Sequence, residues 1–348
     1  MHIGFLIYGS LDTLSGGYLY DRKLVEYLRA QGDTVDVISL PWRNYAAHIT
    51  DNLRFRLPPS LDLLIQDELN HPSLISANRR RRSYPVISLV HHLRCSERRA
   101  KWQNAFYRVI ERRYLNSVDG FIFNSKTTEK VVNSLTRNRR PSVVAYPPTD
   151  RFGDAISEKE VRARAPAGPL RILFLGNVIE RKGLHTLLKA LNSRIPAYSL
   201  DVVGSLDVEP AYARKMQQFV RANRLAPITH FHGPLGPERL KSKLQQAHIL
   251  IVPSSYEGFG IAYLEGMGFG LPAIGTTAGA AGEVIEHEKT GYLIEPGDHQ
   301  ALGQYLTALS KDRALLEKLS LNARSRYNEQ PSWNDTVGQI RTFLQSMT

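Results

Sequence analysis

Two glutamates bracket a glycine-rich segment in the second half of the chain. Glu257 is followed by Gly258, Phe259 and Gly260, and Glu265 comes after seven intervening residues. A carboxylate can accept two hydrogen bonds from hydroxyl groups, as a ribose clamp does. Backbone N–H groups in a glycine loop can approach a phosphate or a sugar closely, because no side chain blocks the way. The glycine loop therefore suits a ligand that carries phosphate.

Positive side chains that could neutralise a diphosphate lie in the segment GNVIERKG, where Arg181 and Lys182 are adjacent. A diphosphate gains negative charge as its bond to a sugar breaks. Cations and N–H groups therefore stabilise the transition state more than the ground state. Many enzymes that break such a bond hold a metal with Asp-x-Asp, but no two aspartates in this chain have that spacing. We expect no metal, and assign the task to positive side chains and helix N-termini.

In the first half of the chain, Gly16 and Gly17 follow the first apolar run. They form either a simple turn or a tight turn whose amides face a diphosphate. His91 and His92 follow a second apolar run, where a parallel sheet would present its carboxyl edge. Alternation directs one of the two toward a cleft and the other into packing; we place His92 in the site. Two adjacent histidines without further ligands make a poor metal site.

Apolar runs and helical patterns alternate along the first 150 residues, as in βαβ units. Arg43–Pro59 shows no clear periodicity and is expected to include an exposed loop. Ser15 is expected to open a helix, and further helices are expected at Glu97–Leu115 and Lys126–Leu135. The expected strands are His2–Tyr8, Thr34–Leu40, Leu61–Ile65, Val86–Val90, Gly120–Phe123 and Val143–Tyr146.

The same alternation restarts after residues 151–169, which contain Pro, Gly and mixed charge and are predicted to be a linker. The sequence therefore predicts an α/β protein with a domain at 1–150, a second at 170–330 and a final helical segment at 331–348. The expected strands of the second domain are Arg171–Leu175, Leu200–Val203, Ile228–Phe231, His248–Val252 and Pro272–Gly275. The expected helices are Gly183–Leu191, Tyr212–Asn223, Glu238–Gln246, Ile261–Phe269, Leu302–Leu309, Leu315–Ala323 and Trp333–Leu344.

The glycine-rich segment also resembles a known family. E-x7-E in the setting PSxxEGFGxxxLEGMxxGxP is similar to the retaining nucleotide-sugar glycosyltransferases of GT-B fold and family 4 type (glycosyl transferases group 1). GNVIERKG resembles their G-R-x-x-x-x-K-G, with Lys182 at the lysine position. Asn177 occupies the arginine position and brings no charge. Arg181 is the candidate for the missing charge, unless its side chain points to solvent.

The resemblance implies two Rossmann-like doubly wound domains that face each other across a cleft, with the last helix crossing back to pack on the first. It implies that Glu265 binds the nucleotide and Glu257 contacts the donor sugar. A histidine of the first domain would lie near the sugar hydroxyls. We expect a hexosyltransferase of EC 2.4 class that acts on a UDP- or GDP-hexose with retention and without metal or other cofactor. The predicted catalytic residues are Glu257, His92 and Lys182, and the predicted donor-binding residues are Gly16, Gly17, Asn177, Arg181, Lys182, Gly258, Phe259, Gly260 and Glu265.

Positive charge is concentrated in the first domain. Residues 79–140 hold 16 Lys and Arg against 4 Asp and Glu, an excess of 12, which equals the excess of the whole chain, 45 minus 33. Such a region is either a solvated face or a surface that attracts anionic lipid. We hypothesise a hydroxyl acceptor that is lipid-linked or a polysaccharide precursor, reached at an anionic membrane surface. The region lacks a nucleic-acid-binding motif, and we expect no nucleic acid.

The composition is that of a globular protein of 348 residues with a single cysteine, Cys95, which excludes an internal disulfide framework. No apolar run reaches the roughly 18 residues of a membrane span. We expect a cytoplasmic enzyme, or one held at the inner face of the membrane. Two alternatives stay open: a nucleotide-sugar epimerase on the same fold, and a non-catalytic module that binds nucleotide sugar or membrane.

Overall fold

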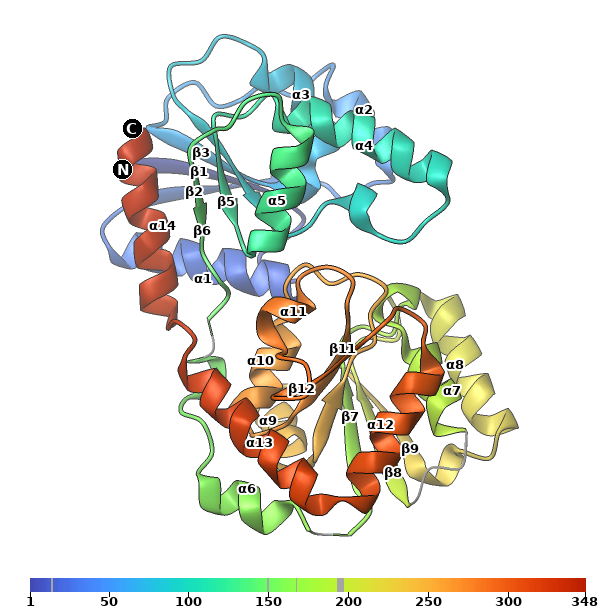
Figure 1. Ribbon diagram of the computed structural model, residues 1–348. Coiled ribbons are helices and arrows are strands. Elements are labelled where there is room, and N and C mark those ends of the chain that lie inside the picture. Colours follow the sequence, from blue (N-terminus) through green and yellow to red (C-terminus); the bar gives the residue numbers. More distant parts are fainter. Residues whose placement is uncertain (14, 149, 167, 193–196) are drawn as a thin grey trace. The chain divides into compact units, whose positions relative to one another are not determined.

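The chain folds into two units, each built on one sheet (Figure 1). This computed structural model describes residues 1–13, 15–148, 150–166, 168–192 and 197–348. The first unit consists of Met1–Pro148 and Pro331–Thr348, and the second of Thr149–Gln330. Among the described residues, no helix is both long and apolar enough to cross a membrane.

The first unit contains a six-stranded sheet in the order β2-β1-β3-β4-β5-β6, and all its strand pairs are parallel. Central strands such as β3 and β4 are buried along their whole length, as strands covered by helices on both faces must be. The strand β2 lies on one side of β1, and all later strands lie on the other. The order in which strands are added across the sheet therefore reverses between β1 and β3. The strands are β1 His2–Tyr8, β2 Thr34–Leu40, β3 Leu63–Asp67, β4 Val86–Val90, β5 Gly120–Phe123 and β6 Ser142–Val144.

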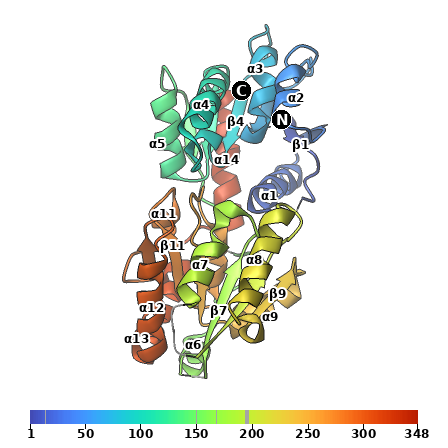
Figure 2. The same cartoon turned by 90° about the vertical axis from the view of Figure 1, so that its right-hand side faces the viewer.

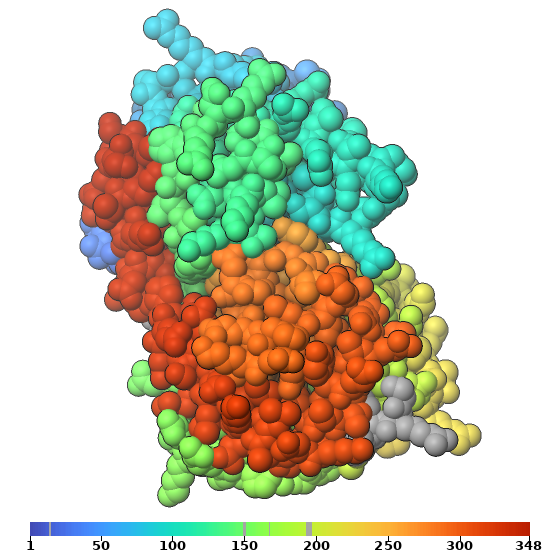
Figure 3. Space-filling model, viewed as in Figure 1, coloured from blue at the N-terminus to red at the C-terminus, as the bar shows by residue number. Residues whose placement is uncertain are grey.

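The last helix, α14 (Trp333–Met347), packs within the first unit, against α1 (Gly16–Ala30) and β6. Its buried side chains join the same apolar core as β1. Arg341 of this helix pairs with Asp33, which also binds the N-terminal amine. Both chain ends therefore lie in this unit, and the red C-terminal helix covers part of its surface (Figure 3). The other helices are α2 Tyr45–Asp51, α3 His71–Asn78, α4 Lys101–Leu115 and α5 Lys126–Leu135, with short 3-10 turns at Glu68–Asn70 and Arg94–Ser96.

The second unit contains a six-stranded parallel sheet in the order β12-β11-β10-β7-β8-β9. Strands β7 to β9 extend the sheet towards one edge, and β10 to β12 extend it towards the other. The order in which strands are added therefore reverses between β7 and β10. In open parallel sheets, ligands bind at the carboxyl ends of strands beside such a reversal. The strands are β7 Leu170–Leu175, β8 Tyr198–Val203, β9 Thr229–Gly233, β10 Ile249–Ile251, β11 Ala273–Thr276 and β12 Gly291–Ile294.

Helices cover this second sheet. The helix α7 packs against both α8 and α12, and Figure 2 shows α7 and α8 side by side on one face. The helix α10 packs against α13, which also contacts α6. The helices are α6 Glu158–Arg164, α7 Leu184–Leu191, α8 Pro210–Ala222, α9 Pro237–Gln246, α10 Ile261–Gly268, α11 Ala281–Val284, α12 His299–Lys311 and α13 Arg313–Asn328. Short 3-10 turns lie at Asp150–Phe152, Glu180–Lys182 and Ala226–Ile228.

The two doubly wound parallel sheets confirm the predicted α/β fold class. The exposed loop predicted within residues 43–59 is present after Asp51, but the prediction of a linker at 151–169 was wrong. Residues 43–59 contain α2, whose first turn is capped by Asn44 through a hydrogen bond from the Ala47 N–H. The predicted linker at 151–169 contains α6, which begins with a capping box at Ser157 and lies within the second unit. Both helices have seven residues, too few for a clear apolar period. The predicted helix at Glu97–Leu115 begins later, at Lys101.

Candidate active site

In the second unit, two predicted site residues meet where the strand order reverses. Lys182 follows β7 and Glu257 follows β10, and these two strands are neighbours. Lys182 Nζ lies 2.6 Å from Glu257 Oε2, and both side chains are largely buried. Parallel strands point their carboxyl ends to the same edge, which brings the two loops together despite 75 residues of separation.

The backbones of these two loops are in direct contact. Gly183 has φ +74°, and a Cβ at this position would lie 2.1 Å from the carbonyl oxygen of Pro253, so only glycine fits. The N–H of Ser255 donates to the carbonyl oxygen of Arg181 at 2.7 Å. The guanidinium group of Arg181 donates in turn to the carbonyl oxygen of Tyr256 at 2.9 Å. Arg181 therefore points to the Glu257 loop rather than to solvent.

The charges at this junction favour an anion. Burial acts to raise the pKa of Glu257, but the charges of Lys182 and Arg181 and a hydrogen bond from Ser254 outweigh it and lower the pKa to about 2. Burial lowers the pKa of Lys182, an effect that Glu257 opposes. The junction thus brings the basic side chains of Lys182 and Arg181 to a single carboxylate. The remaining positive charge suits a phosphate group.

The loop that contains Glu257 is braced from its other side by a second small-residue loop. The N–H of Ala280 donates to the Glu257 carbonyl oxygen at 2.8 Å, and the N–H of Glu257 donates to the carbonyl oxygen of Ala278. Gly260, at φ +100°, ends the loop and begins α10 without a side-chain cap. A Cβ there would lie 2.4 Å from the ring of Tyr263. Gly258 and Phe259 lie between Glu257 and this helix N-terminus, as predicted from the sequence order.

Glu265 lies inside α10 and is buried, with 7% of its surface exposed. Its carboxylate forms an ion pair with Arg151, which comes from the 3-10 turn at Asp150–Phe152. Burial raises the pKa of Glu265, and the charge of Arg151 opposes this shift. The sequence analysis missed Arg151, because it is 114 residues away and belongs to no motif. A ribose that binds Glu265 would share this carboxylate with Arg151.

Asn177, at the position of the family arginine, joins the ends of β7 and β8. Its side-chain oxygen accepts a hydrogen bond from the Ser205 N–H at 3.3 Å. The N–H of Val178 donates back to the Ser205 carbonyl oxygen at 2.9 Å. Asn177 thus holds the backbone that precedes Lys182.

In the first unit, His91 lies at the end of β4 beside the start of α1. A Cβ on Gly17 would lie 3.3 Å from the His91 ring, so the missing side chain lets the two elements approach. His91 Nε2 lies 3.0 Å from Asp21 Oδ1, and the His91 N–H donates to the Glu68 carboxylate at 2.9 Å. Gly16 is the first residue of α1, which Ser15 caps.

His92 points to a different partner. Its Nε2 lies 2.9 Å from Glu97, which also pairs with Arg99. The structure therefore separates the two histidines: His91 lies against Gly17 and Asp21, and His92 lies against the chain that leads to α4. The sequence pattern alone could not distinguish them.

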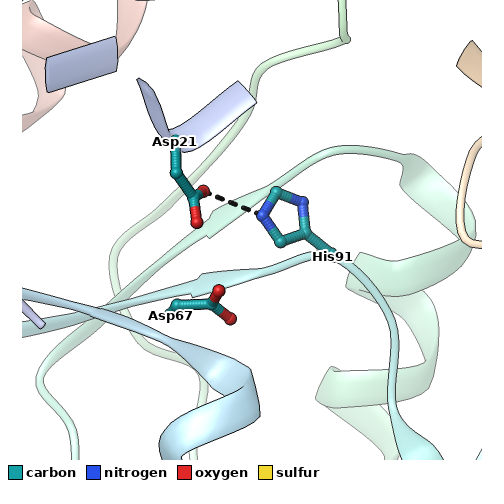
Figure 4. A group of neighbouring side chains, drawn as sticks. All are labelled: Asp21, Asp67 and His91. Atoms are coloured by element: carbon teal, nitrogen blue, oxygen red, sulfur yellow. Dashed lines mark hydrogen bonds and ion pairs between the residues drawn. The ribbon is translucent and has the colours of Figure 1, made fainter. Parts of the chain in front are cut away.

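Figure 4 shows that Asp67, at the end of β3, joins Asp21 and His91 in a buried cluster. Burial raises the pKa of Asp21 to about 7, and burial together with the Asp21 charge raises that of Asp67 to about 8. Burial also raises the pKa of Glu68 and lowers that of His91. Oδ2 of Asp21 is buried without a hydrogen-bond partner. A proton held by this carboxyl pair removes the charge repulsion.

The cluster has the donor types of a metal site. One ligand atom from each of Asp21, Asp67 and His91 lies within 4.8 Å of the others, and it is the one such group among the described residues. The prediction of no metal considered only side chains close in sequence, and these three lie far apart along the chain. That prediction stays a prediction.

A groove of about 820 Å³ lies elsewhere on the second unit, between α7 and α8. Its walls include Glu180, His185, Glu209 and Tyr212. Lys182, Glu257 and Glu265 are not among its lining residues, so the groove is separate from the candidate site.

Comparison with known proteins identifies the family. Residues 156–326 match the family described as glycosyl transferases group 1. The second unit carries a domain of this family. The match covers Lys182, Glu257 and Glu265 and most of the second unit, and the GT-B fold predicted from the sequence is confirmed.

Three similar proteins illustrate the relationship. The capsular polysaccharide biosynthesis glycosyltransferase CapM of Staphylococcus aureus is 26% identical over 179 residues, which are 49% of this chain and 46% of the relative. The structure of sucrose-phosphate synthase from Thermosynechococcus elongatus has a TM-score of 0.80 at 20% identity and covers 99% of this chain and 98% of its own. Anabaena HepE in complex with UDP and glucose has a TM-score of 0.75 at 18% identity, with 99% and 100% covered.

These matches differ in how much of the chain they cover and in how similar the sequences are. The chain spans about half the length of the curated relatives it matches. The solved structures match nearly the whole chain, but at identities that carry the fold alone. The substrates of this chain therefore have to be argued from its own residues.

The Lys182–Glu257 pair should be coupled in stability. We expect Lys182→Met to lower the free energy of unfolding of the second unit by about 3 kcal/mol, because it leaves a buried carboxylate without its partner. The double variant Lys182→Met/Glu257→Gln should lose less than the sum of the two single losses. Urea unfolding measures both, and Lys189→Met, at an exposed position on α7, is the control. Additive losses would show that the pair does not interact.

The buried carboxyl pair should make the stability of the first unit fall as pH rises. Since the folded pKa values of Asp21 and Asp67 lie above their unfolded value of 3.8, the folded state holds the proton more tightly between about pH 4 and 8. We expect Asp67→Asn to flatten the slope of unfolding free energy against pH by up to about 1.4 kcal/mol per unit. Denaturant titrations from pH 5 to 8.5 test this, with the exposed Asp12→Asn as control. An unchanged slope would contradict the assignment.

Proposed function

We propose that this protein transfers a hexosyl group from a nucleoside diphosphate sugar, such as a UDP- or GDP-hexose, to a hydroxyl acceptor. The proposed reaction retains the anomeric configuration and uses no metal. The observation that carries the proposal is the junction of Arg181, Lys182 and Glu257 at the strand-order reversal of a group 1 glycosyltransferase domain. HepE, a protein of similar fold, has been seen with UDP and with glucose.

The proposed roles follow from charge and geometry. Lys182 has three N–H donors, so it can hold Glu257 and a phosphate oxygen together. Arg181 and the amides of Gly258, Phe259 and Gly260 add positive potential where the departing diphosphate gains charge. Glu257 accepts hydrogen bonds from hydroxyls of the donor sugar.

Glu265 accepts hydrogen bonds from the ribose hydroxyls in this proposal. Asn177 contributes through the backbone it holds rather than through charge. In the reaction, the bond between the anomeric carbon and the diphosphate oxygen breaks, and the diphosphate leaves with its electron pair. The acceptor oxygen bonds to that carbon and gives its proton to the departing diphosphate.

The first unit is proposed to supply the remaining contacts. The N-terminal amides of α1 at Gly16 and Gly17 are proposed to face phosphate, and a histidine is proposed to contact sugar hydroxyls. Of the two histidines we now favour His91, because it lies against Gly17 and is oriented by Asp21. His92, chosen from the sequence, remains the alternative that a variant can test.

The acceptor is proposed to be a lipid-linked hydroxyl compound or a polysaccharide precursor, met at the cytoplasmic face of an anionic membrane. The concentration of positive charge within residues 79–140 supports this. The relative CapM carries a name that refers to capsular polysaccharide biosynthesis.

Incubation with radiolabelled UDP-glucose, UDP-galactose, UDP-N-acetylglucosamine or GDP-mannose and a lipid extract tests the proposal. We expect transfer from one donor, unaffected by EDTA, with rates at least about 100-fold lower in Glu257→Gln and Lys182→Met. His91→Ala should reduce the rate far more than His92→Ala.

The outcomes separate the alternatives. NMR of the product should show the anomeric configuration of the donor, and inversion would refute retention. Loss of transfer in EDTA would refute metal independence. Conversion of the donor sugar without any acceptor would indicate an epimerase, and donor binding without turnover would indicate a non-catalytic module.

A further inference from the structure

Large apolar side chains are exposed on two helices of the first unit. On α4, Trp102, Phe106 and Val109 expose 72%, 48% and 51% of their surface. Their spacing of four and three residues places them in one stripe along the helix. Ile49 on α2 exposes 36%, and Leu53 just after that helix exposes 77%. We call these five residues the α2–α4 apolar face.

The start of α2 contacts α4. Tyr45, the first residue of α2, lies with its ring centre 6.1 Å from that of Phe106 on α4 and 5.0 Å from that of Tyr107. Ile49 is one helical turn from Tyr45 and Leu53 is another turn further. Figure 2 shows α2 and α4 on the same unit, together with α3, which packs against both.

Folding does not require this second apolar stripe. The opposite side of α4 already buries Ile110, Tyr114 and Leu115 in the core of the unit. A helix that buries one stripe gains nothing in the isolated chain from a second stripe in water. Contiguous exposed aromatic and aliphatic side chains instead mark an interaction surface.

The charges beside the face select its partner. Lys101, Arg108 and Arg112 are exposed and share a stripe next to the apolar one, and Arg113 is also exposed. The acidic residue of α4, Glu111, is buried and accepts hydrogen bonds from the N–H groups of Arg94 and Cys95. The exposed charge of α4 is therefore entirely positive. A second copy of the chain would meet this face with the same sign of charge, whereas an anionic surface complements it.

The face begins near the candidate site of the first unit. Arg94 follows His92, and its guanidinium lies over the rings of Tyr45 and Tyr107 at 5.2 and 5.0 Å. The short segment from β4 to α4 thus runs from His91 directly to the apolar stripe. A molecule whose hydroxyl end reached the site could keep an apolar end at this face.

We propose that the α2–α4 apolar face docks the protein on an anionic lipid bilayer. Trp102, Phe106 and Leu53 enter the boundary between headgroups and acyl chains, while the Lys and Arg stripe contacts lipid phosphates. The docking can be tested without enzymatic turnover. The suggestion that docking gives access to a lipid-linked acceptor rests on the proposed function. It places the contact on α2 and α4 rather than on the basic run Arg79–Arg82, where Arg82 is held by Asp119.

Flotation with vesicles of phosphatidylcholine and phosphatidylglycerol in equal parts tests this docking. We expect the full-length protein to bind them and to bind pure phosphatidylcholine vesicles far more weakly. Trp102→Ser/Phe106→Ser should weaken binding at least about tenfold, because two large apolar side chains no longer leave water. Trp102→Phe, which keeps the apolar ring, should retain most of it. Val208→Ser, which removes an exposed apolar side chain from the second unit, is the matched control.

A charge-matched pair locates the basic contact. Lys101→Glu/Arg108→Glu should weaken vesicle binding more than Arg79→Glu/Arg80→Glu, although both change the net charge by four. Stabilisation of the protein by UDP or GDP should be unchanged in the Trp102→Ser/Phe106→Ser variant, which separates docking from donor binding.

Three results would overturn the docking proposal. One is the absence of binding to anionic vesicles. Another is equal binding of the Trp102→Ser/Phe106→Ser variant and the unaltered protein. The third is a dimer in light scattering that this variant abolishes, which would show that a second copy covers the face.

Discussion

The second unit depends on the close contact of two loops at the reversal of its strand order. Lys182 and Glu257 neutralise each other there, and Gly183 lets the backbone of one loop touch that of the other. Backbone hydrogen bonds hold the Glu257 loop from both sides: the Ser255 N–H donates to the Arg181 carbonyl oxygen, and the Ala280 N–H donates to the Glu257 carbonyl oxygen. The net positive charge that remains is the basis for proposing a diphosphate site at this junction.

The first unit uses the same topology for different chemistry. Its strand order also reverses, between β1 and β3, and the groups collected there are Asp21, Asp67 and His91. Burial favours the uncharged forms of all three groups, in contrast to the charged pair of the second unit. Neutral groups suit sugar hydroxyls, as cations suit phosphates.

Local signals predicted much of the fold. The strands β1, β2, β4 and β5 have the predicted bounds. Strands β1, β4 and β5 are short, mostly apolar runs, whereas β2 mixes polar and apolar residues. The short helices α2 and α6 were missed because seven residues give no period. In the site, the sequence around Glu257 and the segment GNVIERKG predicted Glu257 and Lys182, but no local pattern indicated Arg151. The buried cluster of Asp21, Asp67 and His91 exists only through the pairing of distant strands. The choice between His91 and His92 also required the position of α1.

The central claim is that Glu265 and the Lys182–Glu257 junction bind a nucleoside diphosphate. The most direct measurement is a thermal-shift series with UDP, GDP, ADP, dTDP and their sugar conjugates, with and without EDTA. The account predicts a rise in Tm with one nucleotide family, unaffected by EDTA and lost in Glu265→Ala. No rise with any nucleotide, or a rise that persists unchanged in Glu265→Ala, would contradict it.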